Sequence, residues 1–234
     1  MTIQLTIDGE VVTTTEGTPL VEVAAANGTY VPTLCHHPGS PCLGTCRVCA
    51  VRVNGAIAAS CSLGARDGMV VEVNTPELRD LRRTIVEMLF VEGVHNCPSC
   101  EKSGRCQLQA VALDMRLEGA RFPYRYPDRE AEHDAARIWL ERDRCIFCQR
   151  CVEFVRDRET GKKIFSISRR GERARIELDV ELADAMPPEQ VAEAVDLCPV
   201  GAILAKGVGS DVPIGQRRYE AWSLRNRVLG RRPS

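Results

Sequence analysis

Alternation of apolar and polar residues predicts paired β-strands in the first third of the chain. The first such pair turns at Asp8-Gly9 and the second at Asn54-Gly55, and both dipeptides are typical of tight hairpin turns. The runs with this pattern are 3–7, 11–14, 48–53, 56–60 and 69–73. Between the two pairs, Thr18 is expected to cap a short helix that Pro19 opens and that ends near Gly28.

Helical periodicity follows from position 75 onward. Thr75 is expected to cap a helix opened by Pro76, and a second short helix is expected from Cys106. The apolar stripes that we expect to face the core are Leu78, Leu81, Ile85, Met88 and Leu89 in the first helix and Leu108, Val111, Ala112 and Met115 in the second. Residues 119–133, which include Arg-Phe-Pro-Tyr-Arg-Tyr-Pro, resemble a linker.

A third region of alternating elements is predicted after this linker. The expected elements are strands at 137–140, 164–168 and 174–178, a helix ending near Arg158, and a helix at 188–197. The chain as a whole is therefore expected to be an α+β protein.

Composition narrows the class of protein. The 234 residues carry 31 Lys and Arg against 32 Asp and Glu, a net charge of −1, which argues against a principal role in binding nucleic acid or an anionic membrane. A hydrophobic content of 44% allows buried cores. No apolar run reaches the length of a spanning helix, and residues 1–10 lack the pattern of an export signal. We therefore expect a reducing compartment.

Twelve cysteines are the unusual feature of the composition. In a reducing compartment, thiols that recur at C-x2-C spacing indicate metal or redox chemistry rather than disulfides or scattered core residues. They fall into three groups along the chain: Cys35, Cys42, Cys46, Cys49 and Cys61; Cys97, Cys100 and Cys106; and Cys145, Cys148, Cys151 and Cys198.

The last group has the most specific spacing. Its first three cysteines form C-x2-C-x2-C, the start of a bacterial ferredoxin run, but Val155 stands where the fourth is due. Cys198-Pro199 matches the end of a second run that has no other cysteine. In two-cluster ferredoxins the last cysteine of each run ligates the other cluster. Cys145, Cys148, Cys151 and Cys198 are therefore predicted to hold one [4Fe–4S] cluster; a zinc ribbon is the rival interpretation.

The first group resembles a plant-type [2Fe–2S] pattern. Cys46 and Cys49 supply its inner pair and Cys61 the distant ligand, whereas spacing alone leaves Cys35 and Cys42 as alternatives for the remaining place. The order of hairpin, helix, cysteine loop and hairpin is typical of a β-grasp ferredoxin.

The middle group is one ligand short of a four-iron cluster. His95 is the nearest spare ligand to Cys97, Cys100 and Cys106, and the alternative is that it is only a polar residue. Eleven cysteines with His95 make twelve ligands, enough for three clusters, and leave Cys42 spare. An imidazole in place of a thiolate makes such a cluster easier to reduce.

Three motifs in this order resemble a known arrangement: Cys35-x10-Cys46-Arg-Val-Cys49, Glu92-Gly-Val-His95-Asn-Cys97-x2-Cys100-x5-Cys106-Gln-Leu-Gln109 and Arg144-Cys145-x2-Cys148-x2-Cys151. The chain is similar to the amino-terminal part of the large iron–sulfur subunit of respiratory complex I. It is more similar still to the small, gamma-type diaphorase subunit of cytoplasmic NAD-reducing nickel–iron hydrogenases. The resemblance runs from residue 2 to about 206.

The resemblance implies a domain plan and a choice of ligands. It implies a β-grasp [2Fe–2S] domain at 1–75, a helical His/Cys segment with linker at 76–133 and a ferredoxin-like [4Fe–4S] domain at 134–206. It selects Cys35 over Cys42, giving Cys35, Cys46, Cys49 and Cys61 as the [2Fe–2S] ligands. The best-known form of the middle motif has its histidine where Gly93 stands, but relatives commonly carry one at the place of His95, which we keep as the ligand.

The implied function is electron transfer in an oxidoreductase complex. The chain has no Gly-rich phosphate loop and no catalytic set free of the metal motifs. FMN, NAD and the hydrogen-splitting metals are therefore expected on partners: a flavin/NAD-binding diaphorase subunit and the small and large hydrogenase subunits. The equivalent subunit of an NAD-dependent formate dehydrogenase or of a complex I variant is an alternative. A zinc-bound interaction module is an alternative of another class.

Basic residues mark the end of the chain. Lys206, Arg217, Arg218, Arg225, Arg227, Arg231 and Arg232 stand against Asp211 and Glu220, with Trp222 among them. Residues 207–234 are expected either to be a solvated tail or to dock on a partner through arginine contacts and one aromatic side chain.

Overall fold

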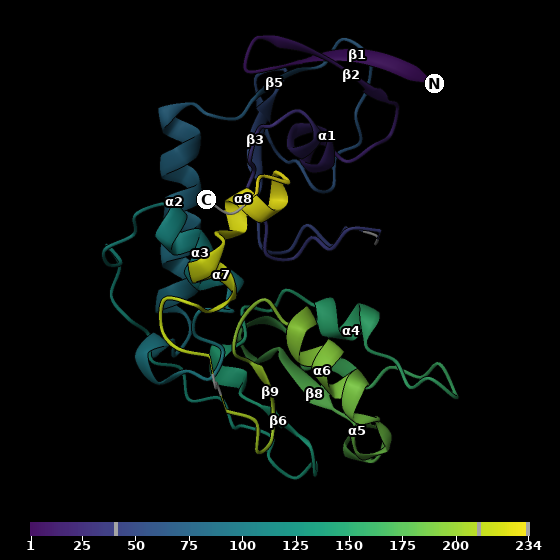
Figure 1. The fold of residues 1–234 in the computed structure, drawn as a ribbon, viewed down its shortest axis with the longest axis vertical. Helices are drawn as coiled ribbons and strands as arrows, with labels where there is room; N and C mark the ends of the chain where they lie inside the picture. The colour runs from purple at the N-terminus through teal and green to yellow at the C-terminus, as the bar shows by residue number, and fades with distance from the viewer. Residues whose placement is uncertain (40–41, 210–211, 233–234) are drawn as a thin grey trace.

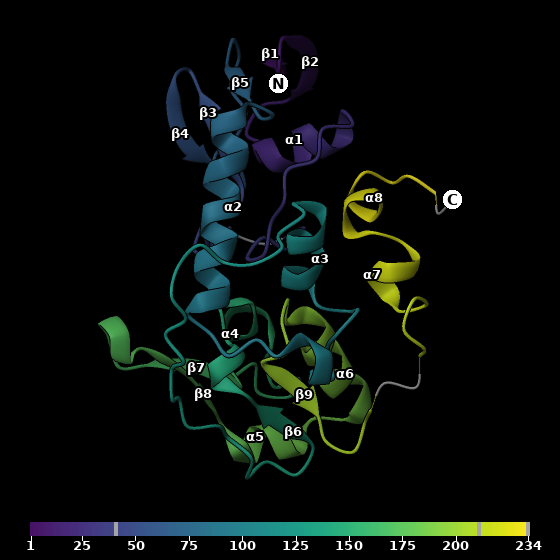
Figure 2. The same ribbon diagram turned by 90° about the vertical axis from the view of Figure 1, so that its left-hand side faces the viewer.

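A mixed five-stranded sheet occupies one end of the molecule (Figure 1). The structure is a computed structural model that describes residues 1–39, 42–209 and 212–232. The strands are β1 (Thr2–Ile7), β2 (Glu10–Thr15), β3 (Ala50–Val53), β4 (Ala56–Ala59) and β5 (Val70–Glu72). Their order is β2-β1-β5-β3-β4, with β1 parallel to β5 and antiparallel to β2. Helix α1 (Leu20–Ala26) lies beside this sheet in both ribbon views (Figures 1 and 2).

The two predicted hairpins are confirmed. Asp8 and Gly9 both have positive φ, as do Asn54 and Gly55, which is the backbone geometry that matches the twist of paired strands. In β1 the buried residues are Ile3, Leu5 and Ile7, so the alternation in the sequence places one face of the strand against the core.

The expected cap of α1 is wrong. Pro19 occupies the N-cap position and no side chain caps the helix. The backbone of Thr18 instead accepts from the Ala65 N–H at 2.8 Å, and Pro19 forms an isolated β-bridge with Gly64. This extended segment is held by tertiary pairing, so the Thr18 side chain is not needed at the helix end.

Helix α2 (Pro76–Val91) connects the two ends of the molecule (Figure 2). The Thr75 hydroxyl caps it as predicted, accepting from the Leu78 N–H at 3.3 Å. The expected stripe is only partly correct, since Met88 is 45% exposed. The residues buried on this helix are Leu78, Arg82, Val86, Glu87 and Val91. The buried face of α2 therefore differs from the expected stripe. It is the face against which β3 and α3 (Gln107–Asp114) pack.

Two small antiparallel pairs and three helices form the other end. Strand β6 (Ile138–Leu140) pairs with β9 (Ile203–Ala205), and β7 (Phe165–Ser168) with β8 (Arg175–Leu178). The helices are α4 (Arg150–Phe154), α5 (Val180–Ala185) and α6 (Pro188–Leu197). Helix α4 ends earlier than expected because Arg156 pairs in an isolated bridge with Lys163. Strand β9 and α5 were not expected.

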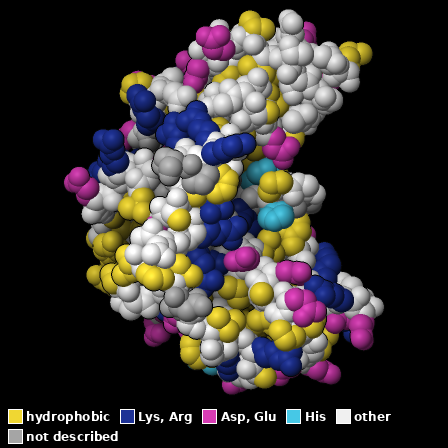
Figure 3. Space-filling model, in the orientation of Figure 1, with side chains coloured by type: hydrophobic (Ala, Val, Ile, Leu, Met, Phe, Trp, Pro, Cys, Tyr) yellow, Lys and Arg dark blue, Asp and Glu magenta, His cyan; other side chains and the backbone are white. Residues whose placement is uncertain are grey.

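The basic end of the chain folds back on the molecule as α7 (Arg218–Ala221) and α8 (Leu224–Val228). Tyr219 N–H donates to the Gly104 carbonyl at 2.9 Å, and Arg225 pairs with Asp114 at 3.6 Å. Arg227 lies over the Trp222 ring, 4.4 Å from its centroid. Basic side chains gather on the face that carries these helices (Figure 3). Docking on a partner stays a prediction; residues 210, 211, 233 and 234 lie outside the described residues.

None of the described helices combines the length and the apolar character needed to cross a bilayer.

Candidate metal centres

The first site, called here the N-terminal site, is the set Cys35, Cys46, Cys49 and Cys61. The loop after α1 brings Cys35 and Cys46 to it, and the hairpin β3–β4 brings the other two. The Cys49 thiol donates to Cys61 Sγ at 3.1 Å, and all four cysteines are buried. The structure therefore brings together the four residues that the resemblance selects.

Contacts among these thiols change their protonation. Hydrogen bonds with Cys46 and Cys61 hold the pKa of Cys35 well below its ordinary value. A hydrogen bond with Cys61 lowers the pKa of Cys49 to about 7. The pKa of Cys61 is raised by its hydrogen bonds with Cys35 and Cys49, with a smaller contribution from Cys42. The thiolate is the form of cysteine that binds metal. The half-buried Cys42 is a fifth sulfur at this site.

The second site, called the His/Cys site, is the set His95, Cys97, Cys100 and Cys106. One small cavity is lined by all four of them. A 3-10 turn at Cys97–Ser99 separates the first two cysteines. Cys106 stands at the N-cap of α3, where its Sγ accepts from the Gln109 N–H at 3.4 Å.

His95, which lines this cavity, has a ring nitrogen without a hydrogen-bond partner. Its Nε2 is buried and has no hydrogen-bond partner, while burial lowers the pKa of the ring to about 4. A buried polar atom without a partner is costly, and a neutral imidazole nitrogen is a common metal ligand. The ring lies edge-on to Phe90, with the centroids 5.4 Å apart. The observation fits a ligand better than a bystander.

Gly93 faces the same space as His95. A Cβ built on Gly93 would stand 2.5 Å from His95 Nε2 and 3.0 Å from the Asp143 carbonyl oxygen. A side chain at 93 and the His95 ring would therefore compete for one position.

The third site, called the C-terminal site, is the set Cys145, Cys148, Cys151 and Cys198. A second small cavity is lined by all four, so the end of α6 does bring Cys198 to the triple. Val155, at the place of the missing fourth cysteine, is buried in the core.

The cysteine loop of this site has an unusual backbone. Phe147 and Gln149 have φ values of 54° and 64°, a left-handed conformation that costs a non-glycine residue about 1 kcal/mol or more. Alternation of such residues turns backbone N–H groups toward one centre, and the Phe147 N–H donates to Cys145 Sγ at 3.4 Å. Burial raises the pKa of Cys145 to about 11, so a bound cation would replace a proton there.

The C-terminal site contacts both of the others. Toward the N-terminal site, the Thr45 hydroxyl donates to the Cys148 carbonyl at 3.4 Å. Toward the His/Cys site, the Gln107 N–H donates to the Pro199 carbonyl at 2.8 Å and the Cys106 thiol lies 3.6 Å from the same oxygen. The site whose cysteines come last in the chain therefore lies next to each of the other two.

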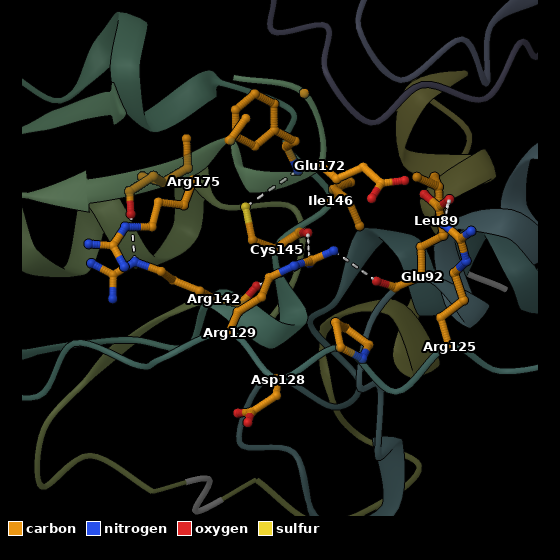
Figure 4. A pocket seen from close by; sticks show the side chains of 15 residues that line it. Leu89, Glu92, Arg125, Asp128, Arg129, Arg142, Cys145, Ile146, Glu172 and Arg175 are labelled. Atoms are coloured by element: carbon orange, nitrogen blue, oxygen red, sulfur yellow. Dashed lines mark hydrogen bonds and ion pairs between the residues drawn. The ribbon is translucent and has the colours of Figure 1, made fainter. Parts of the chain in front are cut away.

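A larger cavity of about 640 Å³ opens beside Cys145. Figure 4 shows Arg129 and Arg142 around it. The Arg129 guanidinium donates to the carbonyls of Cys145 at 3.4 Å and Glu92 at 3.1 Å. This arginine therefore ties the end of α2 to the cysteine loop, next to an opening on one side of the C-terminal site.

Two arginines at these contacts were given no function in the sequence analysis, although Arg144 stands in one of the motifs quoted there. Arg144 reaches Cys100 Sγ, with an Nη1–Sγ distance of 3.8 Å, and Arg150 donates to the His36 carbonyl at 2.6 Å. Both flank cysteines of the ferredoxin-like run. Their position next to ligand candidates was the available signal, but spacing along the chain does not show where a guanidinium reaches.

The donor sets fit iron–sulfur clusters. Cysteine thiolates hold such clusters, and histidine replaces cysteine at some of them. A four-iron cluster takes four ligands in total, one on each iron. Among residues 1–39, 42–209 and 212–232, no three His, Cys, Asp or Glu side chains are grouped closely enough for a single metal ion.

Three family models match the chain. They are the 2Fe-2S iron-sulfur cluster binding domain at residues 1–76, the NADH-ubiquinone oxidoreductase-G iron-sulfur binding region at 82–121, and the ferredoxin-like domain of NADH-quinone oxidoreductase subunit 3 at 135–204. Iron–sulfur binding regions thus cover all three sites, and the predicted fold class is confirmed.

Relatives match either the whole chain or most of it. The gamma subunit of the NAD-reducing hydrogenase HoxS of Cupriavidus necator is 63% identical over 229 residues, 98% of each chain. A chain in a crystal structure of an NAD+-reducing [NiFe]-hydrogenase in the H2-reduced state superposes with a TM-score of 0.85 at 39% identity, covering 93% of both.

More distant relatives are subunits of complex I. The mitochondrial 78 kDa subunit of the NADH-ubiquinone oxidoreductase of Candida albicans is 30% identical over 208 residues, and that of Neurospora crassa is 30% identical over 209 residues. Each match covers 87% of this chain, which spans only 28% of the relative's length. The chain belongs to the family of gamma subunits of NAD-reducing hydrogenases, which is related to the amino-terminal part of the complex I iron–sulfur subunit.

Proposed function

We propose that this chain is the iron–sulfur electron-transfer subunit of an NAD-reducing [NiFe] hydrogenase in the cytoplasm. The observation that carries the proposal is the row of three sulfur-rich sites in direct contact, in a chain that matches a hydrogenase gamma subunit over 98% of its length. The chain works as part of the oxidoreductase complex and has no catalytic site of its own.

The proposed ligands are those brought together at the three sites. A [2Fe–2S] cluster takes Cys35, Cys46, Cys49 and Cys61. One [4Fe–4S] cluster takes His95, Cys97, Cys100 and Cys106, and a second takes Cys145, Cys148, Cys151 and Cys198. The shared cavities, the free His95 nitrogen and the mutual contacts of the first four thiols support this assignment.

The contacts also support an order for the relay. Because the C-terminal site touches both neighbours, electrons would pass from the N-terminal site to the C-terminal site and then to the His/Cys site, or in reverse. The order in space is therefore not the order in the chain. The N-terminal site would face the subunit that carries FMN and NAD, and the His/Cys site the hydrogenase small and large subunits.

The residues of this chain hold and shield the relay. Clusters accept and release single electrons with little rearrangement. The reaction of the complex, H2 with NAD+ to NADH and one proton, moves two electrons, so they would cross this chain one after the other. The left-handed loop around Cys148 would hold the C-terminal site in a fixed shape, which limits reorganisation at each transfer.

The test is metal analysis and electron paramagnetic resonance of the anaerobically purified complex, with variants Cys198→Ser and, as a matched control, Cys42→Ser. We expect nickel in the complex, and in Cys198→Ser the loss of about four irons and of one four-iron signal, with the [2Fe–2S] signal kept. The control retains every signal. Zinc bound in place of iron, molybdenum in place of nickel, or loss of only the [2Fe–2S] signal in Cys198→Ser would overturn the proposal.

A further inference from the structure

Arg144 belongs to two sites at once. Its backbone precedes Cys145 of the C-terminal site, while its guanidinium lines the cavity of the His/Cys site. A 3-10 turn at Arg142–Arg144, in which the Cys145 N–H donates to the Arg142 carbonyl at 3.0 Å, sets the direction of this side chain.

The guanidinium is placed on a candidate ligand sulfur. Arg144 Nη1 lies 3.8 Å from Cys100 Sγ and 2.9 Å from a carboxylate oxygen of Glu101, and 3.5 Å from the Gly201 carbonyl oxygen. The side chain is 23% exposed. A charged donor at a half-buried sulfur acts in a medium of low effective dielectric constant, where its field is much stronger than in water.

Gly201 makes this approach possible. A Cβ at 201 would stand 2.7 Å from Cys100 Sγ and 3.6 Å from Arg144 Cδ. The turn after Cys198 therefore packs directly on the Cys100 sulfur, and Arg144 closes the same contact from the other side. The sulfur, the guanidinium and the backbone of the neighbouring site meet at one junction.

We propose that Arg144 is a positioning residue that raises the reduction potential of the His/Cys site, with Glu101 limiting the effect. The inference rests on the proposed function. Reduction adds one negative charge to the cluster, and a guanidinium at a ligand sulfur stabilises the reduced form. The carboxylate of Glu101 offsets part of that positive charge.

A purely structural ion pair makes a different prediction. If Arg144 and Glu101 only held the loop together, removal of either partner would disturb the site in the same way. If their charges set the potential, neutralising the arginine and neutralising the glutamate shift it in opposite directions.

The experiment is a redox titration of the intact complex, followed by electron paramagnetic resonance, for Arg144→Gln, Glu101→Gln and Arg144→Lys. Arg158→Gln is the control, since Arg158 is half exposed and pairs with Glu193 at the surface. We expect a lower midpoint potential of the His/Cys site in Arg144→Gln, a higher one in Glu101→Gln and a smaller change in Arg144→Lys. In all three variants the [2Fe–2S] cluster keeps its wild-type midpoint potential. In the control Arg158→Gln the potential of the His/Cys site is also unchanged.

Shifts of the same sign in Arg144→Gln and Glu101→Gln, or none in either, would refute the inference. If the complex with Arg144→Gln does not assemble, Glu101→Gln is sufficient as a test: an unchanged or lowered potential of the His/Cys site in that variant would refute the inference. Absence of any iron–sulfur signal in the wild-type complex would instead refute the proposed function.

Discussion

The buried guanidinium of Arg150 donates to the backbone carbonyl of His36, with an Nη2–O distance of 2.6 Å. Arg150 is only 4% exposed and also donates to the Leu197 carbonyl at 3.3 Å. His36 follows Cys35, and Leu197 precedes Cys198. One side chain therefore joins the N-terminal site to both chain segments of the C-terminal site.

Replacement of Arg150 by Met is expected to destabilise the junction. One buried and one partly buried carbonyl would lose a charged donor, which corresponds to a loss of about 3 kcal/mol in the free energy of unfolding. Denaturant unfolding of the complex, followed by visible absorbance, measures this change. The control Arg158→Met removes an exposed ion pair and should change stability by about 0.5 kcal/mol or less. Equal midpoints for the two variants would contradict the bridging role.

The shared space of Gly93 and His95 makes a rescue experiment possible. His95→Ala is expected to abolish or shift the signal of one four-iron cluster, because the open nitrogen is removed. Adding Gly93→His to that variant should restore a histidine at the site, since a side chain at 93 enters the volume that the His95 ring leaves once the Asp143 carbonyl, 3.0 Å from a Cβ at 93, moves aside slightly. Electron paramagnetic resonance of the complex tests both. Identical potentials in wild type and His95→Ala would show that His95 is not a ligand.

Cys35 and Cys42 can be distinguished by paired substitutions. Cys35 is 2% exposed and contacts Cys46 and Cys61, whereas Cys42 is partly exposed. Cys35→Ser is therefore expected to remove the [2Fe–2S] signal, and Cys42→Ser to retain it. The reverse result would assign the ligand role to Cys42.

Glu87 is expected to make stability depend on pH. Its carboxylate is fully buried and pairs with Arg121 at 2.7 Å and Arg83 at 3.0 Å. Burial alone would raise the pKa of Glu87, but hydrogen bonds from the two arginines outweigh it and lower the pKa. Folding thus favours the ionised form, so its stabilisation is complete above the ordinary pKa of about 4.3 and disappears as the pH falls through the lower folded value.

Glu87→Gln should therefore melt below the wild type at pH 7, with a gap that narrows as the pH falls below about 4.3. Thermal melting between pH 3.5 and 7 checks this, with the exposed Glu16→Gln as the control. A gap that stays constant over this range would mean that the carboxylate charge is not what stabilises the wild type.

Local chemistry explains which features were predictable. The Asp8-Gly9 turn, the Thr75 cap and the C-x2-C spacings act over a few residues, so their structures follow from neighbours in the chain. Counting gave three groups but left Cys35 and Cys42 as alternatives, and the resemblance selected Cys35. Two of the three proposed ligand sets, those of the His/Cys site and the C-terminal site, each line one small cavity.

Features that depend on distant partners were not predictable in this way. The burial of Glu87 depends on its ion pair with Arg121, which lies 34 residues further along the chain. Strand β9 is short and is recognisable only through its pairing with β6.

The sequence by itself thus determined which residues are candidates for holding metal, thiols at metal-binding spacings with one nearby histidine, and their β-grasp and ferredoxin-like setting. Only the tertiary structure decided the adjacency of the groups, with the C-terminal site between the other two, and the reach of Arg144 and Arg150 across the junctions. The physical reason is that ligand spacing is set by bonds along the chain. Adjacency is set by hydrogen bonds and packing between segments up to 114 residues apart.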